Sequence, residues 1–126
     1  MILGTGIDII EVERIARARE KFGQRFLRRI LLDSEINYCL LHQDPAPFLA
    51  ARFAAKEAVS KAFGTGIGAD LGWQDIEICR RDSGEPFVVL HDKGQLLFQR
   101  RNAGTLHVSL SHTDKHATAI AILEGA

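Results

Sequence analysis

The stretch RFAAKEAVSKAFGTGIG, residues 52–68, places a carboxylate where a purely structural role is hard to assign. At 3.6 residues per turn, Glu57 shares a helix face with Leu49 and Phe53. Lys61 follows one turn later, and an exposed i,i+4 ion pair of this kind would contribute only about 0.2–0.5 kcal/mol. A face that carries large apolar side chains is not expected to meet water. The sequence therefore predicts that Glu57 holds a partner, for which a cation is a candidate.

Asp8 is a second carboxylate whose position needs a reason. The segment ILGTGIDII, residues 2–10, alternates as a strand does, which places Asp8 on the same side as Gly4 and Gly6. Its neighbours on that side therefore have no side chains, and the sequence alone offers Asp8 no structural partner.

Three glycines in the segment GTGIG, residues 64–68, follow the helix that carries Glu57. They match neither a P-loop, because no G-K-[ST] follows, nor the dinucleotide fingerprint, whose glycines precede a helix. Gly64 suits the left-handed position that ends a helix. The alternative is that exposed amides at this turn contact a phosphate-rich ligand near Lys61, and the glycines alone leave both possibilities open.

The pattern of the remaining chain predicts the elements that must position these groups. Strands are expected at residues 2–10, 73–80, 86–91, 106–112 and 116–123, with turns at 82–85 and 113–115. Helices are expected from about residue 11 to Gly23, around 26–31, from a cap at Asp33 or Ser34 to about 41, from the 44–47 break to about 63, and over 92–102. This order predicts one α+β domain, residues 1–126, with a mainly antiparallel sheet packed against helices.

The helix that contains Glu57 carries a stripe of small residues on another face. Its members fall in one narrow sector and would allow close approach to a sheet or a second helix. They are Ala51, Ala55, Ala58 and Ala62.

Composition and cysteine content bound the class of protein. Hydrophobic residues make up 46% and charged residues 25%, which is ordinary for a soluble domain. Cys39 and Cys79 lie far apart in apolar runs, so reduced core thiols in a cytoplasmic protein are expected rather than a disulfide or zinc site. The apolar N-terminal segment is interrupted by Asp8 and has no basic region before it, so neither a signal peptide nor a membrane span is expected.

The formal net charge is zero, but the charge is unevenly distributed. Between Glu13 and Arg29, seven basic residues face only two acidic ones; we call these seven the basic strip. They are Arg14, Arg17, Arg19, Lys21, Arg25, Arg28 and Arg29. Such a strip suits an acidic protein surface or nucleic acid, and it is equally compatible with a solvated helix face.

Taken together, three motifs resemble those of the bacterial holo-[acyl-carrier-protein] synthases, the short members of the 4′-phosphopantetheinyl transferase superfamily. The motifs are GIDIIEVERI at residues 6–15, RFAAKEAVSKAFGTGIG at residues 52–68 and HVSLSH at residues 107–112. Their order, separation and the chain length agree with that family, so the resemblance covers essentially the whole sequence.

The resemblance implies an enzyme that transfers the 4′-phosphopantetheine arm of coenzyme A to a serine of apo-acyl carrier protein. It implies release of adenosine 3′,5′-bisphosphate, a need for Mg²⁺ and a place in fatty acid biosynthesis. Asp8 and Glu57 correspond to the family's metal ligands, and carboxylates together with substrate phosphates are ligands that Mg²⁺ accepts. Glu57 or a metal-held water would deprotonate the serine, and the sequence does not choose between them.

Further site residues follow from the same resemblance. Lys61 is expected to contact phosphate and is counted with Asp8 and Glu57 in the catalytic set, whereas Lys56 either helps or is merely solvated. Gly64, Gly66 and His112 are expected at the coenzyme A site, His112 against phosphate or adenine.

Other polar residues near the third motif receive simpler interpretations. His116 lies four residues after His112, but no third nitrogen or sulfur ligand is placed nearby, so a metal pair is not favoured. Ser109 and Ser111 lack a base at the spacing of a nucleophile motif and are interpreted as strand positions.

The family also implies a homotrimer with coenzyme A bound between subunits. Acyl carrier proteins are acidic, which gives the basic strip a partner: Arg14 matches a carrier-contacting arginine, and Arg17, Arg25 and Arg28 are further candidates. Two other classes remain to be tested. A non-catalytic binding module would not need Asp8 paired with Glu57, and a nucleic-acid binder is disfavoured by the neutral pI and the lack of a known motif.

Overall fold

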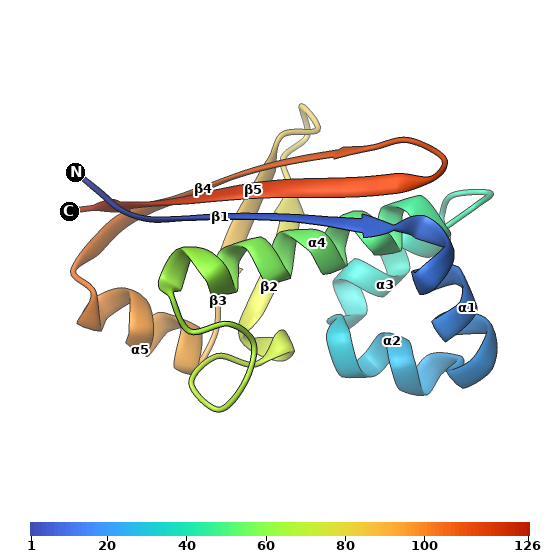
Figure 1. The fold of residues 1–126 in the computed structure, drawn as a ribbon, viewed down its shortest axis with the longest axis horizontal. Helices are drawn as coiled ribbons and strands as arrows, with labels where there is room; N and C mark the ends of the chain where they lie inside the picture. Colours follow the sequence, from blue (N-terminus) through green and yellow to red (C-terminus); the bar gives the residue numbers. More distant parts are fainter.

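The computed structural model describes all residues, 1–126, and confirms an α+β domain with antiparallel sheets (Figure 1). Its elements in chain order are β1 (Ile2–Glu11), α1 (Val12–Phe22), α2 (Gln24–Ile30), α3 (Asp33–Leu40), α4 (Ala46–Phe63), the 3₁₀ turn η1 (Trp73–Asp75), β2 (Ile76–Arg80), β3 (Pro86–Leu90), α5 (Lys93–Arg100), β4 (Ala103–His112) and β5 (His116–Gly125). No helix has both the length and the apolar character needed to cross a bilayer.

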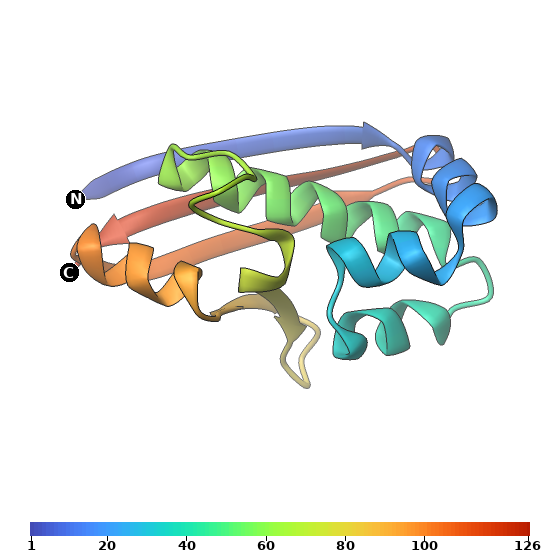
Figure 2. The ribbon, with the colours of Figure 1, turned by 90° about the horizontal axis from the view of Figure 1, so that it is seen from below.

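Three long strands form the main sheet, in the antiparallel order β1-β5-β4. Helix α4 runs along one face of this sheet, α1 to α3 gather at one end, α5 lies at the other end, and the β2-β3 hairpin lies between α5 and α3 (Figures 1 and 2). The central strand β5 presents Ala117, Ala119 and Ala121 to the core, all fully buried. Small side chains on both surfaces let α4 lie close to the sheet, as the alanine stripe predicts.

The closest approach of α4 is to β1, at two glycines. A Cβ atom on Gly4 would collide with the carbonyl oxygen of Ala62, and one on Gly6 with the carbonyl oxygen of Ala58. Glycine is therefore required at both positions by space rather than by backbone conformation, because neither has a positive φ. The strand side that the sequence assigns to Gly4, Gly6 and Asp8 is the side that faces α4.

The opposite face of the main sheet is open. Ile7 and Ile9 of β1 are 64% and 68% exposed, and Ile120 of β5, which pairs with Ile7, is 41% exposed. Isoleucine side chains on a strand normally pack against another layer, so a single chain leaves an apolar surface uncovered on this face of its sheet.

Several element boundaries differ from the sequence prediction, among them the start of β4, which lies at Ala103 rather than at residue 106. Helix α3 begins after Leu32 rather than after a cap at Asp33 or Ser34, because the Leu32 amide donates to the Glu35 carboxylate at 2.7 Å. Residues 73–75 form η1 instead of the start of a strand, and α5 ends at Arg100 because Asn102 takes a positive φ of 50°. The turns at 82–85 and 113–115 and the helix end at Gly23 are confirmed.

Both cysteines are free thiols, as expected. Cys39 is fully buried and Cys79 is half-buried. Burial raises the pKa of each thiol to about 11, so both are protonated and unreactive near neutral pH.

Replacing Gly6 by alanine should strongly destabilise the fold, because the added methyl group meets helix backbone that cannot move away cheaply. We expect a loss of about 3 kcal/mol of unfolding free energy in denaturant titrations, at the upper end for overpacking. Gly68→Ala is the matched control, since a Cβ there meets nothing within 4 Å. An equal effect of the two substitutions would contradict the role assigned to the contact between β1 and α4.

Candidate active site

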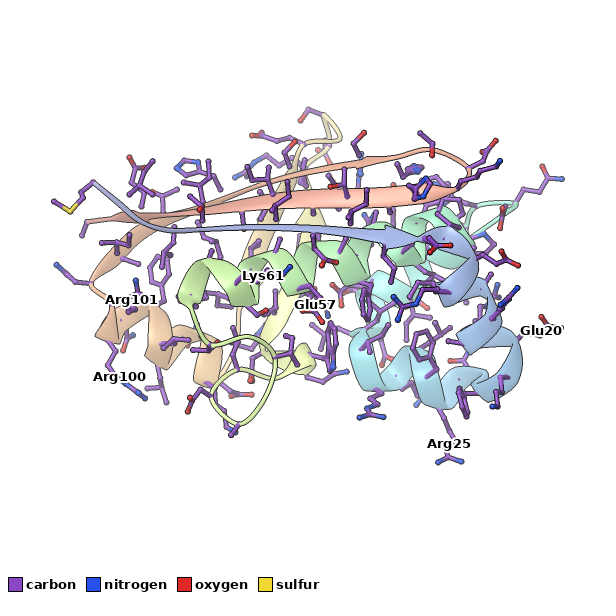
Figure 3. All side chains as sticks on the ribbon, in the orientation of Figure 1. Glu20, Arg25, Glu57, Lys61, Arg100 and Arg101 are labelled. Atoms are coloured by element: carbon purple, nitrogen blue, oxygen red, sulfur yellow. The ribbon has the colours of Figure 1, made fainter.

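Asp8, Glu57 and Lys61 come together where β1 passes α4. The Lys61 ammonium donates to the Ile7 carbonyl at 2.9 Å and lies 3.3 Å from the Asp8 carboxylate. Glu57 and Lys61 both lie on the side of α4 next to β1 (Figure 3). The Asp8 side chain is 18% exposed and that of Lys61 49%, so the cluster is open to solvent and to a ligand.

The strand backbone at Asp8 is fixed from the other side by β5. Thr118 donates its hydroxyl to the Asp8 carbonyl at 2.8 Å, in addition to the ladder in which Asp8 lies opposite Ala119. The position of this carboxylate is therefore set by the sheet and not by a mobile loop.

The environment of Glu57 disfavours its charge. Partial burial raises the pKa of Glu57, the nearby charge of Asp8 raises it further, and the Lys61 ammonium acts in the opposite direction. Phe53, one turn earlier on α4, packs against Trp73 with ring centroids 4.9 Å apart and supplies the apolar surroundings. The predicted apolar neighbour and cationic neighbour of Glu57 are thus both confirmed.

A divalent cation fits this pair of carboxylates. Two acids close enough to raise a pKa by mutual repulsion are stabilised together by a positive ion between them. The structure gathers no third His, Cys, Asp or Glu beside them. A cation held here would take its other ligands from a bound molecule and from water, which is the habit of Mg²⁺ with phosphate substrates.

Lys56, the residue before Glu57, was expected either to help bind phosphate or to be solvated, and the structure shows neither. Its side chain is fully buried and forms an ion pair with Glu35 at 2.7 Å, so it is neither solvated nor available to a phosphate. Burial lowers the pKa of Lys56, and Glu35 opposes that shift. Sequence reasoning missed both partners because each has the polar character of a surface residue.

The glycine turn serves as the end of α4. Gly64 takes the left-handed conformation, with φ 81° and ψ 4°, which confirms the predicted helix cap. The amides of Thr65 and Gly66 donate to the Ser60 carbonyl, each at 3.2 Å, and the Gly64 amide donates to Lys61. These amides already donate hydrogen bonds to carbonyls at the end of α4. Contacts of Gly64 and Gly66 with a nucleotide stay a prediction.

His112 and Asp8 lie on the same face of the main sheet. His112 is on β4, however, so the two residues flank α4 on opposite sides. The ladder places Asp8 in one row with Ala119 and Leu110, whereas His112 pairs with Ala117 in the next row on β4. Its ring contacts Phe48 edge-on, with centroids 4.8 Å apart. Within one chain, His112 is therefore separated from Asp8 and Glu57 by the width of the helix.

Arg52 is a candidate that sequence reasoning did not single out. It is 2% exposed, its guanidinium lies 4.4 Å from the Tyr38 ring centroid, and its Nε has no hydrogen-bond partner. Arg80 lies over the same ring at 5.4 Å, and neither arginine forms an ion pair with an acid. With His112 they line a cavity of about 290 Å³ that contains no acid, and Glu77 lines the neighbouring cavity together with both arginines.

The basic strip lies on the surface of α1 and α2. Arg14, Arg25 and Arg28 are exposed, and Arg25 points away from the body of the molecule (Figure 3). Arg17 is paired with Glu13 at 2.9 Å, which makes it the less available of the four predicted carrier contacts. His116, Ser109 and Ser111 are exposed, and both serines are strand positions of β4 as predicted.

Comparison with known proteins agrees with the fold. The profile of the 4′-phosphopantetheinyl transferase superfamily matches residues 4–121. A holo-[acyl-carrier-protein] synthase from Koribacter versatilis is 48% identical over 98% of this chain and 99% of its own length.

Two solved structures share the whole fold. The Helicobacter pylori holo-[acyl-carrier-protein] synthase in complex with coenzyme A is 34% identical, with a TM-score of 0.85 over 95% of this chain and 99% of that one. The Bacillus anthracis holo-(acyl-carrier-protein) synthase in complex with CoA (3′,5′-ADP) is 39% identical, with a TM-score of 0.82 over 100% and 99%.

The α+β fold is that of a phosphopantetheinyl transferase. The chain belongs to the holo-[acyl-carrier-protein] synthase family within the 4′-phosphopantetheinyl transferase superfamily. This membership decides against the non-catalytic binding module and the nucleic-acid binder.

Asp8→Asn should lower the pKa of Glu57, because it removes the repelling charge and releases Lys61 to act on Glu57 alone. The pKa of Glu57 is measured by NMR from the chemical shift of its carboxyl carbon as a function of pH. In the native protein Glu57 holds its proton more tightly than in the unfolded chain, so its contribution to stability declines as pH rises through the raised pKa. Asp82→Asn in the distant hairpin turn is the control, and an unchanged Glu57 titration in Asp8→Asn would refute the coupling.

Proposed function

We propose that this protein transfers 4′-phosphopantetheine from coenzyme A to a serine of apo-acyl carrier protein, in support of fatty acid biosynthesis in the cytoplasm. The observation that carries the proposal is the convergence of Asp8, Glu57 and Lys61 at one point of a family fold. In the reaction the serine oxygen forms a bond to the β-phosphorus of coenzyme A. The bond from that phosphorus to the bridging oxygen breaks, and adenosine 3′,5′-bisphosphate leaves.

Asp8 and Glu57 would hold Mg²⁺, which supplies charge neutralisation at the pyrophosphate when bound. Lys61, held beside Asp8 by the Ile7 carbonyl, offers its remaining N–H to a phosphate oxygen. Glu57 has a raised pKa, which suits it to receive the serine proton, while a water at the site is the alternative base. Partial burial of the cluster strengthens each of these interactions relative to open water.

The positive side of α4 suits the rest of the nucleotide. Arg52, Arg80 and His112 surround a cavity that contains no acid. An anionic group of the substrate would satisfy the free Nε of Arg52 and pair with its charge. Because this cavity and the carboxylate pair lie on opposite sides of α4 in one chain, we infer that one substrate is bound by residues of two neighbouring subunits.

The open face of the main sheet supplies an interface for such an assembly. Ile7, Ile9 and Ile120 form an exposed apolar surface on strands β1 and β5. Burying this surface in a homotrimer would remove its contact with water and bring the edges of neighbouring chains together.

The transfer itself is tested by intact-mass analysis of an apo-carrier incubated with the protein, coenzyme A and Mg²⁺. We expect the carrier to gain one phosphopantetheine group, and EDTA to prevent it. Glu57→Ala should lower turnover by on the order of a hundredfold or more, because several kcal/mol of charge stabilisation is lost. Glu20→Ala, an exposed acid on α1, is the control. Turnover of Glu57→Ala within a few-fold of wild type would contradict the assignment.

Carrier recognition by the basic strip is tested by charge reversal. Arg14→Glu, Arg25→Glu and Arg28→Glu combined should raise the apparent KM for the carrier and weaken its salt dependence, with coenzyme A affinity nearly unchanged. Arg100→Glu, an exposed reversal on α5, is the control. Steady-state kinetics over a range of ionic strength measures both effects. A carrier KM that stays at the wild-type value would remove the strip from the interface.

The proposed trimer is tested by sedimentation equilibrium. Ile9→Glu on the open sheet face should dissociate it and abolish transfer, because a charge would be buried without a partner. Leu41→Glu is the matched control: Leu41 is 82% exposed but lies after α3, not on the open sheet face. A monomeric wild-type protein would refute the trimer. A trimer that survives Ile9→Glu would show that another surface forms the interface.

A further inference from the structure

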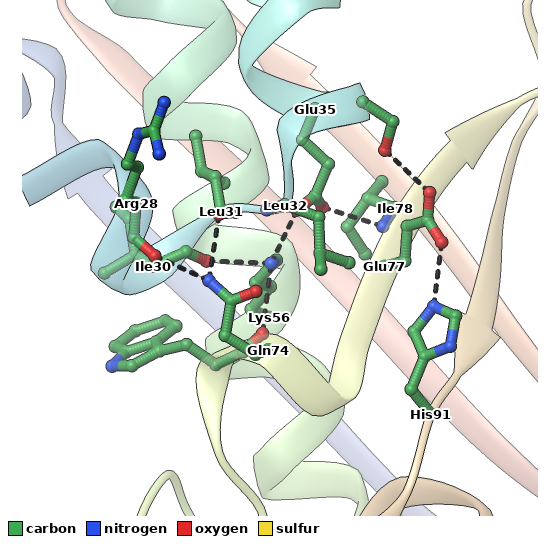
Figure 4. A network of polar contacts seen from close by, with 12 residues as sticks. Arg28, Ile30, Leu31, Leu32, Glu35, Lys56, Gln74, Glu77, Ile78 and His91 are labelled. Atoms are coloured by element: carbon green, nitrogen blue, oxygen red, sulfur yellow. Dashed lines mark hydrogen bonds and ion pairs between the residues drawn. The ribbon is translucent and has the colours of Figure 1, made fainter. Parts of the chain in front are cut away.

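The buried ammonium of Lys56 joins three separate segments of the chain. It donates to the Glu35 carboxylate at 2.7 Å, to the Ile30 carbonyl at 2.8 Å and to the Trp73 carbonyl at 3.1 Å (Figure 4). These acceptors use all three of its protons, and they belong to α3, to the end of α2 and to η1. Lys56 is therefore fully committed to internal contacts from the middle of α4.

Glu35 continues the connection to two further segments. Its Oε1 also accepts from the Leu32 amide at 2.7 Å, and its Oε2 accepts from the Ile78 amide of β2 at 2.8 Å. The carboxylate is as fully buried as Lys56. A buried charge with this many fixed donors has one geometry available, which orients the α2–α3 junction against α4.

The end of α2 depends on side chains from elsewhere in the chain. Gln74 donates to the Arg28 carbonyl at 2.7 Å and to the Leu31 carbonyl at 2.9 Å, next to the bond from Lys56 to Ile30. Carbonyls at a helix C-terminus lack partners within the helix, and here Lys56 and Gln74 provide them. Helix α2 packs mainly on α1, α3 and η1, so the bond from Lys56 to Ile30 is its direct polar link to α4, and the Gln74 bonds tie its end to η1.

We propose that Lys56, Glu35 and Gln74 are positioning residues that fix α2, with its exposed Arg25 and Arg28, relative to Glu57 on α4. The proposal rests on the proposed transfer reaction and on carrier docking at the basic strip. A carrier held by α2 presents its serine to the site only if the two helices keep their spacing. Displacement of a reacting group by about 1 Å can cost on the order of a hundredfold in rate.

Disrupting the network is expected to change kcat but not the KM for the carrier. The charges of the basic strip stay in place when the network is cut, so carrier KM should change little. The serine would be misplaced, so kcat should fall. Coenzyme A affinity should also change little, because Lys61 and Arg52 are not members of the network.

Trp73 gives a readout that needs no activity. It is the only tryptophan, its carbonyl accepts from Lys56, and its ring packs on Phe53 beside Glu57. Its emission and its quenching by acrylamide therefore report whether the network holds this segment in place.

The decisive comparison uses Lys56→Met, Glu35→Gln and the double variant. Each single variant leaves a buried polar partner unsatisfied and should lose stability, while the double variant, without either charge, should regain much of it. We expect kcat of the double variant to stay ten- to a hundredfold below wild type, with carrier KM and coenzyme A affinity within about twofold and with altered Trp73 quenching. Val59→Ala, a buried cavity variant on α4, is the stability-matched control and should keep kcat and quenching.

Gln74→Ala keeps the test valid if the buried variants do not fold, because Gln74 is exposed. It should lower kcat by a few-fold, whereas the exposed Gln99→Ala on α5 should not. A double variant that regains both stability and kcat, or a Gln74→Ala enzyme with wild-type kcat and Trp73 quenching, would overturn the proposal. If wild type transfers no phosphopantetheine, the proposed function fails, whereas unchanged Trp73 quenching in the network variants counts against the positioning role alone.

Discussion

The approach of α4 to β1 is the contact on which the site depends. Because Gly4 and Gly6 leave no side chain between strand and helix, the Asp8 carboxylate and the Lys61 ammonium lie 3.3 Å apart. Larger residues would move the helix outward and separate Asp8 on the strand from Glu57 and Lys61 on the helix. The spacing between the backbones of β1 and α4 thus determines how close the side chains of the site lie to one another.

Lys56 and Glu57 are adjacent on α4, but their side chains enter different parts of the structure. Successive positions on a helix point about 100° apart, so Lys56 enters the core while Glu57 faces the site. The buried ion pair of Lys56 with Glu35 adds little to stability by the usual balance of desolvation and attraction. What it does provide is a single permitted arrangement of α2, α3 and η1 around the helix that carries the site.

The sequence predicts features that follow from local spacing, and it misses those that depend on distant partners. Strand alternation and helical periodicity place Asp8 toward α4 and Glu57 beside Phe53 and Lys61. The burial of Lys56 could not be predicted, since it depends on Glu35, a residue 21 positions away that has no distinguishing pattern around it. The same holds for Arg52, whose exposure is decided by Tyr38 and by β4, and for the place of His112 across the helix.

The strand order has a consequence for how this domain is made. Strand β5 is the last element in chain order, yet it is the centre of the main sheet and pairs with both β1 and β4. The hydrogen bond from Thr118 to the Asp8 carbonyl spans 110 residues. During synthesis β1 must therefore wait, unpaired and rich in isoleucine, until β5 leaves the ribosome. A nascent chain that stops short of β5 would expose an aggregation-prone edge and would have no assembled carboxylate pair.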